Sequence, residues 1–228
     1  MRYIRVHYNA PVVLTFSLLA LTLYVVDLWF KGALTRGLFV TGPPFSLLDP
    51  LDYVRLVSHT VGHGSPGHLF SNLTMILLLG PTLEERYGSQ NMLKMMLLTA
   101  LLVGVLNLAV IRSGLLGASS IVFMFITLIS IVDLRRGSIP VSFILVAILF
   151  IGNEILQAFG EDNISQAGHI TGALLGALFG FALGDGAGLN PLVRVVRWVF
   201  QRFWILAGVL AAIAVVPAAL NALLGLMQ

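Results

Sequence analysis

Four polar side chains lie within long apolar stretches of the sequence, where such groups are costly and tend to serve a function. They are His68, Asn72, Ser119 and His169. A serine hydroxyl becomes a good nucleophile when a base takes its proton, and histidine is the usual base. His68 and Asn72 are four residues apart, so on a helix they share one face and both can donate hydrogen bonds. This set fits acyl transfer, with Ser119 as nucleophile, His169 as base, and His68, Asn72 and the Ser119 backbone N–H as oxyanion donors.

The composition indicates the environment in which this chemistry would take place. Of the 228 residues, 58% are hydrophobic and only 10% are charged, whereas a soluble domain has about 25% charged residues. Uncharged apolar stretches recur along nearly the whole chain, which predicts several bilayer-spanning helices. The net charge of +3 comes from basic residues scattered at helix ends, so we expect lipid and not nucleic acid as the partner. The absence of cysteine excludes disulfides and thiol catalysis.

Charges, prolines and glycines divide the chain into seven predicted helices. The sequence therefore predicts an all-α, polytopic transmembrane bundle: a core of six helices within residues 1–190, and an extra C-terminal helix within residues 191–228. The fourth helix is notably short, and the connection 31–66 is expected to lie in the membrane interface. The predicted helices are residues 11–30, 67–85, 90–111, 118–133, 139–158, 166–184 and 198–226.

The distribution of Lys and Arg predicts the orientation. With the N-terminus inside, nine basic residues lie on the inner side and four (Lys31, Arg36, Arg55 and Arg112) on the outer side. We therefore expect a multi-pass protein of the plasma (inner) membrane, with its N-terminus cytoplasmic and its C-terminus outside.

The four polar side chains are predicted to lie at one depth. Counting back from the charges that end their helices (Asp133, Asp185 and Glu84) places them roughly 18–24 Å above the inner boundary, at a rise of about 1.5 Å per residue. In a hydrocarbon core of about 30 Å, this level lies below the outer surface. A polar layer shared by three helices predicts a cavity that water can enter.

Glycines predict how the serine and the histidine meet. Gly172, Gly176 and Gly180 recur every four residues after His169, which leaves one helix face without side chains. Such faces allow close helix packing in membranes, so we expect the sixth predicted helix to pack on the fourth. The carboxylates lie at the other membrane face or in a loop, so a Ser–His dyad is expected and not a triad.

Two further histidines, His59 and His63, also have i, i+4 spacing and could bind a metal together with His68. No carboxylate or cysteine joins them. We therefore expect hydrogen bonding within the first loop, and neither a metal nor another cofactor.

Several sequence runs resemble the rhomboid intramembrane proteases, in matching order and spacing over about residues 50–185. The runs are HTVGH at 59–63, HLFSN at 68–72, EERYGS at 84–89, GASS at 117–120 and AGHITG at 167–172. The resemblance implies a serine endopeptidase with nucleophile Ser119, base His169 and oxyanion donors His68 and Asn72. It also implies a membrane-embedded first loop, and single-span membrane proteins with helix-weakening residues near the outer face as substrates.

The chain departs from the family pattern at three positions. Ser120 replaces the glycine that usually follows the nucleophile, and Phe123 stands where many members have a tyrosine stacked on the histidine. Val54 replaces the tryptophan of a Trp-Arg pair whose arginine is Arg55. Because Ser120 is small, we expect activity to survive the loss of that glycine, and we expect the loop 160–163 to act as a lid.

Two other functions fit part of these observations. One is a catalytically silent rhomboid-like protein that binds membrane clients; retention of both Ser119 and His169 argues against it. The other is a small transporter or channel, but the residues that follow Ser119, IVFMFI at 121–126, are too apolar for a permeation path.

Overall fold

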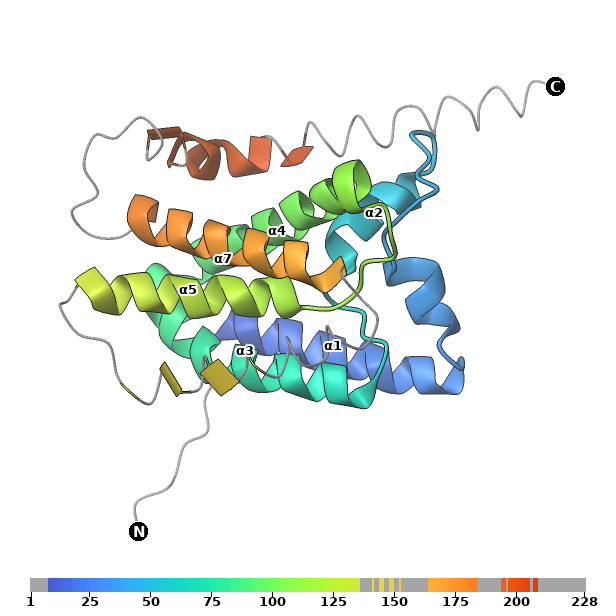
Figure 1. The fold of residues 1–228 in the computed structure, drawn as a ribbon, viewed down its shortest axis with the longest axis horizontal. Helices are drawn as coiled ribbons and strands as arrows, with labels where there is room; N and C mark the ends of the chain where they lie inside the picture. The colour runs from blue at the N-terminus through green and yellow to red at the C-terminus, as the bar shows by residue number, and fades with distance from the viewer. Residues whose placement is uncertain are drawn as a thin grey trace, which may run out of the picture.

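The computed structural model describes residues 8–135, 164–183 and 197–205, together with the short pieces 141, 144–145, 148–149, 152, 194–195 and 207–208. These residues are largely helical, and the one pairing of extended backbone among them is an isolated bridge between Thr41 and Leu115. This confirms the predicted all-α class (Figure 1). The helices are α1 (Pro11–Trp29), η1 (Thr35–Phe39), α2 (Pro50–Ser58), α3 (Pro66–Tyr87), α4 (Ser89–Leu106), η2 (Asn107–Ile111), α5 (Ser119–Arg135) and α7 (Ile164–Leu183).

Five of the predicted helices are observed, as α1, α3, α4 with η2, α5 and α7, and their ends differ from the prediction by at most two residues. The predicted connection 31–66 contains the π-helical turn η1 and the short helix α2. Most of the predicted helix 139–158, the loop 160–163 and most of the helix 198–226 lie outside the described residues. The division of the chain at residue 190 also stays a prediction for that reason.

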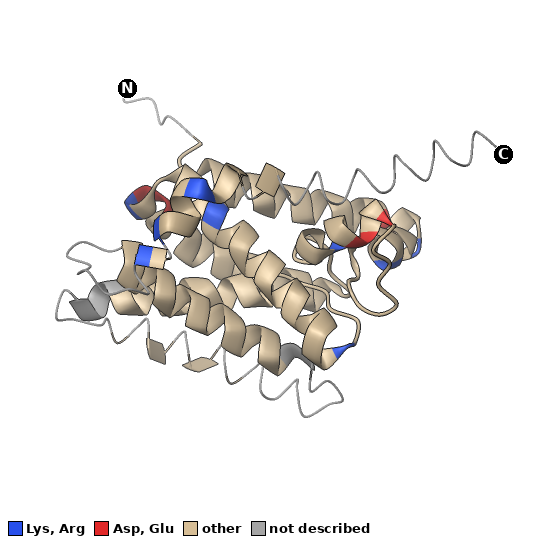
Figure 2. Ribbon diagram, turned by 90° about the horizontal axis from the view of Figure 1, so that it is seen from above, with Lys and Arg blue, Asp and Glu red and all other residues tan. Residues whose placement is uncertain are grey.

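The apolar helices identify a membrane protein. Among the described residues, three helices are long and apolar enough to cross a bilayer: Pro11–Trp29, Ser89–Ile111 and Gln166–Leu183. A shorter apolar helix, Ser119–Ile131, lies between them. The charged residues of the described part of the chain gather at the two ends of the bundle, and the described middle has none (Figure 2), as a hydrocarbon layer requires.

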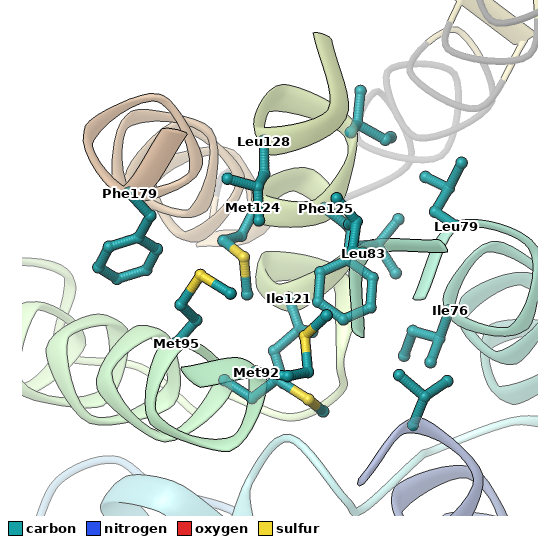
Figure 3. Packing of buried hydrophobic residues seen from close by; sticks show 14 of the residues in the cluster. Ile76, Leu79, Leu83, Met92, Met95, Ile121, Met124, Phe125, Leu128 and Phe179 are labelled. Carbon is teal, nitrogen blue, oxygen red and sulfur yellow. The ribbon is translucent and has the colours of Figure 1, made fainter. Parts of the chain in front are cut away.

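The short helix α5 lies at the centre of the bundle and contacts α3, α4 and α7. Its buried side chains interdigitate with residues from these three helices (Figure 3). A central, well-packed helix gives Ser119, its first residue, a fixed position. The labelled core consists of Ile121, Met124, Phe125 and Leu128 from α5, Ile76, Leu79 and Leu83 from α3, Met92 and Met95 from α4, and Phe179 from α7.

The start of α1 is held by a carboxylate from another helix. Glu84, near the end of α3, is 3% exposed, and its two oxygens accept hydrogen bonds of 2.9 Å from the backbone N–H groups of Val12 and Val13. The first N–H groups of a helix have no intrahelical acceptor, and a negative charge there also complements the helix dipole. Glu84 therefore caps α1 and is more than an interfacial charge.

The C-terminal segment is attached at this same end. The Lys94 ammonium of α4 donates to the Phe200 carbonyl at 3.1 Å, and Arg197 Nε donates to the Ala182 carbonyl at 3.0 Å. Phe200 is buried against Phe179 in an edge-to-face contact. The beginning of the predicted seventh helix thus packs on α4 and α7.

Candidate active site

Ser119 and His169 are in direct contact. The Ser119 Oγ atom lies 2.8 Å from His169 Nε2, across 50 residues of sequence. His169 is buried at 7% exposure, while Ser119 is half-buried. When the hydroxyl donates to Nε2, the ring is in place to take its proton. The structure thus brings together the two residues that were predicted to form a dyad.

Glycines on α7 make this contact possible. A Cβ atom added to Gly172 would lie 2.1 Å from the Ser120 carbonyl oxygen, and one added to Gly176 would lie 2.3 Å from the Met124 carbonyl oxygen. Any side chain at these positions would push the two helices apart. The predicted close packing of these two helices, α7 and α5, is confirmed. Because His169 lies one turn before Gly172 on α7, this packing brings His169 to the N-terminus of α5.

The Phe123 ring packs against the face of the His169 imidazole. The Phe123 and His169 rings are stacked, with centroids 4.3 Å apart and planes 15° apart. Phe123 lies one turn after Ser119 on α5, so one helix presents both the hydroxyl and the ring that supports its partner. The aromatic ring expected at this position is therefore in contact with the histidine, although it has no hydroxyl group.

The segment 112–118, called the strap below, leads into α5 and contacts the His68 ring at Gly117. Gly117 has φ +110°, a conformation that favours glycine, and an added Cβ would lie 2.3 Å from the His68 Cε1 atom. The Gly117 N–H donates to the His59 carbonyl at 2.8 Å. The His68 ring is thus directly over the strap, two residues before Ser119. Because Ser119 begins α5, its backbone N–H has no intrahelical acceptor.

Asn72, the second expected oxyanion donor, lies one turn further along α3 and is fully buried. Its Nδ2 atom is 3.2 Å from His63 Nε2, and its Oδ1 atom has no hydrogen-bond partner among the described residues. The predicted hydrogen bond of His63 within the first loop is confirmed: its Nδ1 atom is 3.0 Å from the Val61 carbonyl oxygen. The second bond, to Asn72, was missed.

The expectation for His59 was wrong. Its side chain does not bond within the first loop; the Nε2 atom is 3.1 Å from the Ala100 carbonyl oxygen of α4. His59 is 0% exposed, and burial lowers the pKa of its imidazole to about 4. It therefore joins three elements, since its own carbonyl also accepts from Gly117 of the strap. Among the described residues, no cluster of three His, Asp or Glu side chains is arranged to hold a metal.

The first loop is anchored without the tryptophan of the expected Trp-Arg pair. Arg55 forms an ion pair of 2.6 Å with Asp52 and also donates to the Gly37 carbonyl. Asp52 in turn accepts from the Ser46 N–H at 2.7 Å. Val54 is exposed and contributes nothing to this network. Arg55 thus ties α2 to η1, together with Ser58, whose Oγ donates to the Leu38 carbonyl at 3.2 Å.

Comparison with known proteins agrees with this arrangement. The Rhomboid domain family matches residues 50–186, which is more than half of the chain. The chain is similar to the rhomboid protease GlpG of Haemophilus influenzae, with 26% identity over 130 residues that cover 56% of this chain and 68% of that protein. It is also similar to Rhomboid-related protein 1 of Caenorhabditis elegans, with 28% identity over 64% of this chain and 44% of that protein. A third similarity, at 30% identity, joins 75% of this chain to 41% of the multidrug resistance protein MdtG of Serratia proteamaculans.

Proposed function

The chain belongs to the rhomboid family, and we propose that it is an active serine endopeptidase that cleaves single-span membrane proteins within the bilayer. The observation that carries this proposal is the 2.8 Å contact between Ser119 Oγ and His169 Nε2. A silent family member has no need to keep a hydroxyl and an imidazole in this geometry. Buried polar groups in a membrane protein are energetically costly, so those that are present tend to serve a function.

The proposed reaction has two halves. Ser119 Oγ attacks the carbonyl carbon of the scissile peptide while His169 Nε2 takes the hydroxyl proton. The C–N bond of the tetrahedral intermediate then breaks, and His169 returns the proton to the leaving amine. A water molecule attacks the resulting ester with His169 again as base, which releases the carboxylic acid and restores the Ser119 hydroxyl.

The oxyanion of each tetrahedral intermediate would be stabilised by His68, Asn72 and the Ser119 backbone N–H. The position of His68 over the strap and the free N–H at the start of α5 support this assignment. The positive end of the α5 dipole favours negative charge at the same place. Removing one such donor typically lowers the rate by about 10²–10³.

The position of the dyad among apolar helices supports the proposed substrate class. A peptide bond inside a helix is shielded by its own turn, so the substrate must unwind locally before Ser119 can reach it. Single-span proteins with glycine, proline or polar residues near the outer membrane face are therefore proposed as substrates. The proposed orientation places the N-terminus in the cytoplasm and the dyad below the outer surface of the plasma (inner) membrane.

Reconstitution in liposomes with a model single-span substrate tests the proposal. The wild type is expected to cut the substrate, while Ser119→Ala and His169→Ala leave it intact. Ser120→Ala, which changes the buried neighbour of the nucleophile, is the matched control and should retain cleavage. Equal cleavage by the wild type, Ser119→Ala and His169→Ala would contradict the proposal.

Two other functions predict different results. A silent client-binding protein would retain the substrate without cutting it and would not react with a fluorophosphonate. Transport is considered because of the similarity to MdtG, and it would need a polar path across the bundle. From the second residue after Ser119, the side chains of α5 are instead apolar and buried in the hydrophobic core: Ile121, Val122, Phe123, Met124 and Phe125.

A further inference from the structure

His63 is a buried side chain that contacts both expected oxyanion donors, and the proposed reaction assigns it no role. It is 2% exposed and lies in the connection between α2 and α3. Its Nε2 atom is 3.2 Å from Asn72 Nδ2, and its ring meets the His68 ring edge to face with centroids 5.1 Å apart. One imidazole therefore contacts both of the side chains that we propose as oxyanion donors.

The hydrogen bonds of His63 determine which of its nitrogens carries the proton. The Val61 carbonyl oxygen, 3.0 Å from Nδ1, can only accept, so Nδ1 must donate. In a neutral imidazole Nε2 is then unprotonated and can only accept. Burial, and secondarily the neighbouring His68, lowers the pKa of His63 to about 4, so the ring is neutral near pH 7.

This protonation state fixes the orientation of the Asn72 amide. An acceptor at His63 Nε2 requires the NH₂ group of Asn72 to point toward it, which is the observed arrangement. With the amide turned around, the Asn72 carbonyl oxygen would face the lone pair of Nε2 without a hydrogen bond. Asn72 donates one N–H to His63 and keeps its second N–H for another acceptor.

We propose that His63 is a positioning residue that holds the Asn72 amide with one N–H directed at the oxyanion. It does not touch the substrate; it acts through Asn72, and it supports the His68 ring from the side. A donor that is already oriented needs no reorganisation when charge develops in the transition state. This inference rests on the proposed protease function.

A double-mutant cycle on cleavage in liposomes tests the inference. His63→Phe keeps a ring of similar size against His68 but removes the acceptor for Asn72. We expect it to lower kcat about tenfold or more, with little change in KM, because the interaction is made only in the transition state. Asn72→Ala is expected to lower kcat by about 10²–10³. The double variant His63→Phe/Asn72→Ala should be no slower than Asn72→Ala alone, because His63 then has no amide to orient.

Two further variants separate positioning from general damage to the loop. His63→Gln restores an acceptor and should recover most of the kcat that His63→Phe loses. His59→Phe is the matched control: it is an equally buried histidine of the same connection, but it bonds to Ala100 and not to Asn72. Its loss of kcat should multiply with that of Asn72→Ala.

The outcomes distinguish this inference from the proposed function. A wild type that does not cleave the substrate would overturn the protease itself. A wild type that cleaves, with losses from His63→Phe and Asn72→Ala that multiply in the double variant, would overturn the role of His63 alone. Failure of His63→Gln to recover activity, while the variant unfolds at the wild-type temperature, would also count against it.

Discussion

Gly172 of α7 lies against the backbone carbonyl of Ser120 on α5, so closely that a Cβ atom would be only 2.1 Å from that oxygen. The two helices therefore meet backbone to backbone, one turn from the Ser119–His169 contact. A hydrocarbon solvent does not drive helices together by the hydrophobic effect, so close packing of this kind carries much of their association. The geometry of the dyad depends on a residue that has no side chain.

Gly172→Ala is predicted to lower activity by about 10²-fold or more, because a shift of about 1 Å between reacting groups has an effect of this size. Cleavage of the model substrate measures the effect. Gly168→Ala is the matched change on the same helix, because its Cβ would make an ordinary contact of 3.5 Å with Val103. We expect Gly168→Ala to unfold at the wild-type temperature, and equal cleavage by Gly172→Ala and the wild type would contradict the packing argument.

Phe123→Ala is predicted to lower kcat about two- to twelvefold, since a stacked aromatic contact contributes about 0.5–1.5 kcal/mol. The ring is parallel to His169 within 15° and keeps it turned toward Ser119. Phe123→Tyr retains the ring and should cleave like the wild type. Similar losses of kcat in the two variants would show that stacking is not what matters at this position.

Glu84→Gln is predicted to lower the free energy of unfolding by about 2 kcal/mol, because its new NH₂ group would face a backbone N–H of α1 without an acceptor. Thermal unfolding in detergent is the measurement. Glu85→Gln changes the adjacent, exposed carboxylate and should alter stability by less than about 0.5 kcal/mol. If both variants unfold alike, the capping role of Glu84 is wrong.

Stability is also predicted to fall in acid. Burial lowers the pKa of His59 from 6.5 to about 4. Between these two values the unfolded chain binds a proton that the folded protein does not. The free energy of unfolding is therefore highest above pH 6.5 and decreases as the pH falls toward 4. The shift corresponds to about 3 kcal/mol. Unfolding curves at a series of pH values should therefore be less pH-dependent in this range for His59→Phe than for the wild type, and equal slopes would contradict the prediction.

The sequence predicted the dyad because each part leaves a local signal. Ser119 and His169 are polar residues in apolar helices, and the glycines after His169 mark the face that packs closely. The partner of Glu84 leaves no such signal. It caps α1 through backbone N–H groups that lie 71 and 72 residues earlier in the chain, and only the packing of α1 beside α3 brings them together.

The histidines show the same limit. The spacing of His59 and His63 predicted hydrogen bonds within the first loop for both, but only His63 forms one, with the Val61 carbonyl. His59 bonds to α4, His63 to Asn72, and His68 lies over Gly117. These partners depend on the path of the connection between α2 and α3. The i, i+4 spacing of His59 and His63 does not specify that path.

The most direct test of the account is to locate the reactive hydroxyl. An alkyl fluorophosphonate phosphonylates an activated serine with loss of fluoride, and tandem mass spectrometry identifies the modified residue. The account predicts an adduct on Ser119 in the wild type, none in Ser119→Ala and a much slower reaction in His169→Ala. An adduct on the neighbouring Ser120, or equal rates in the wild type and His169→Ala, would contradict it.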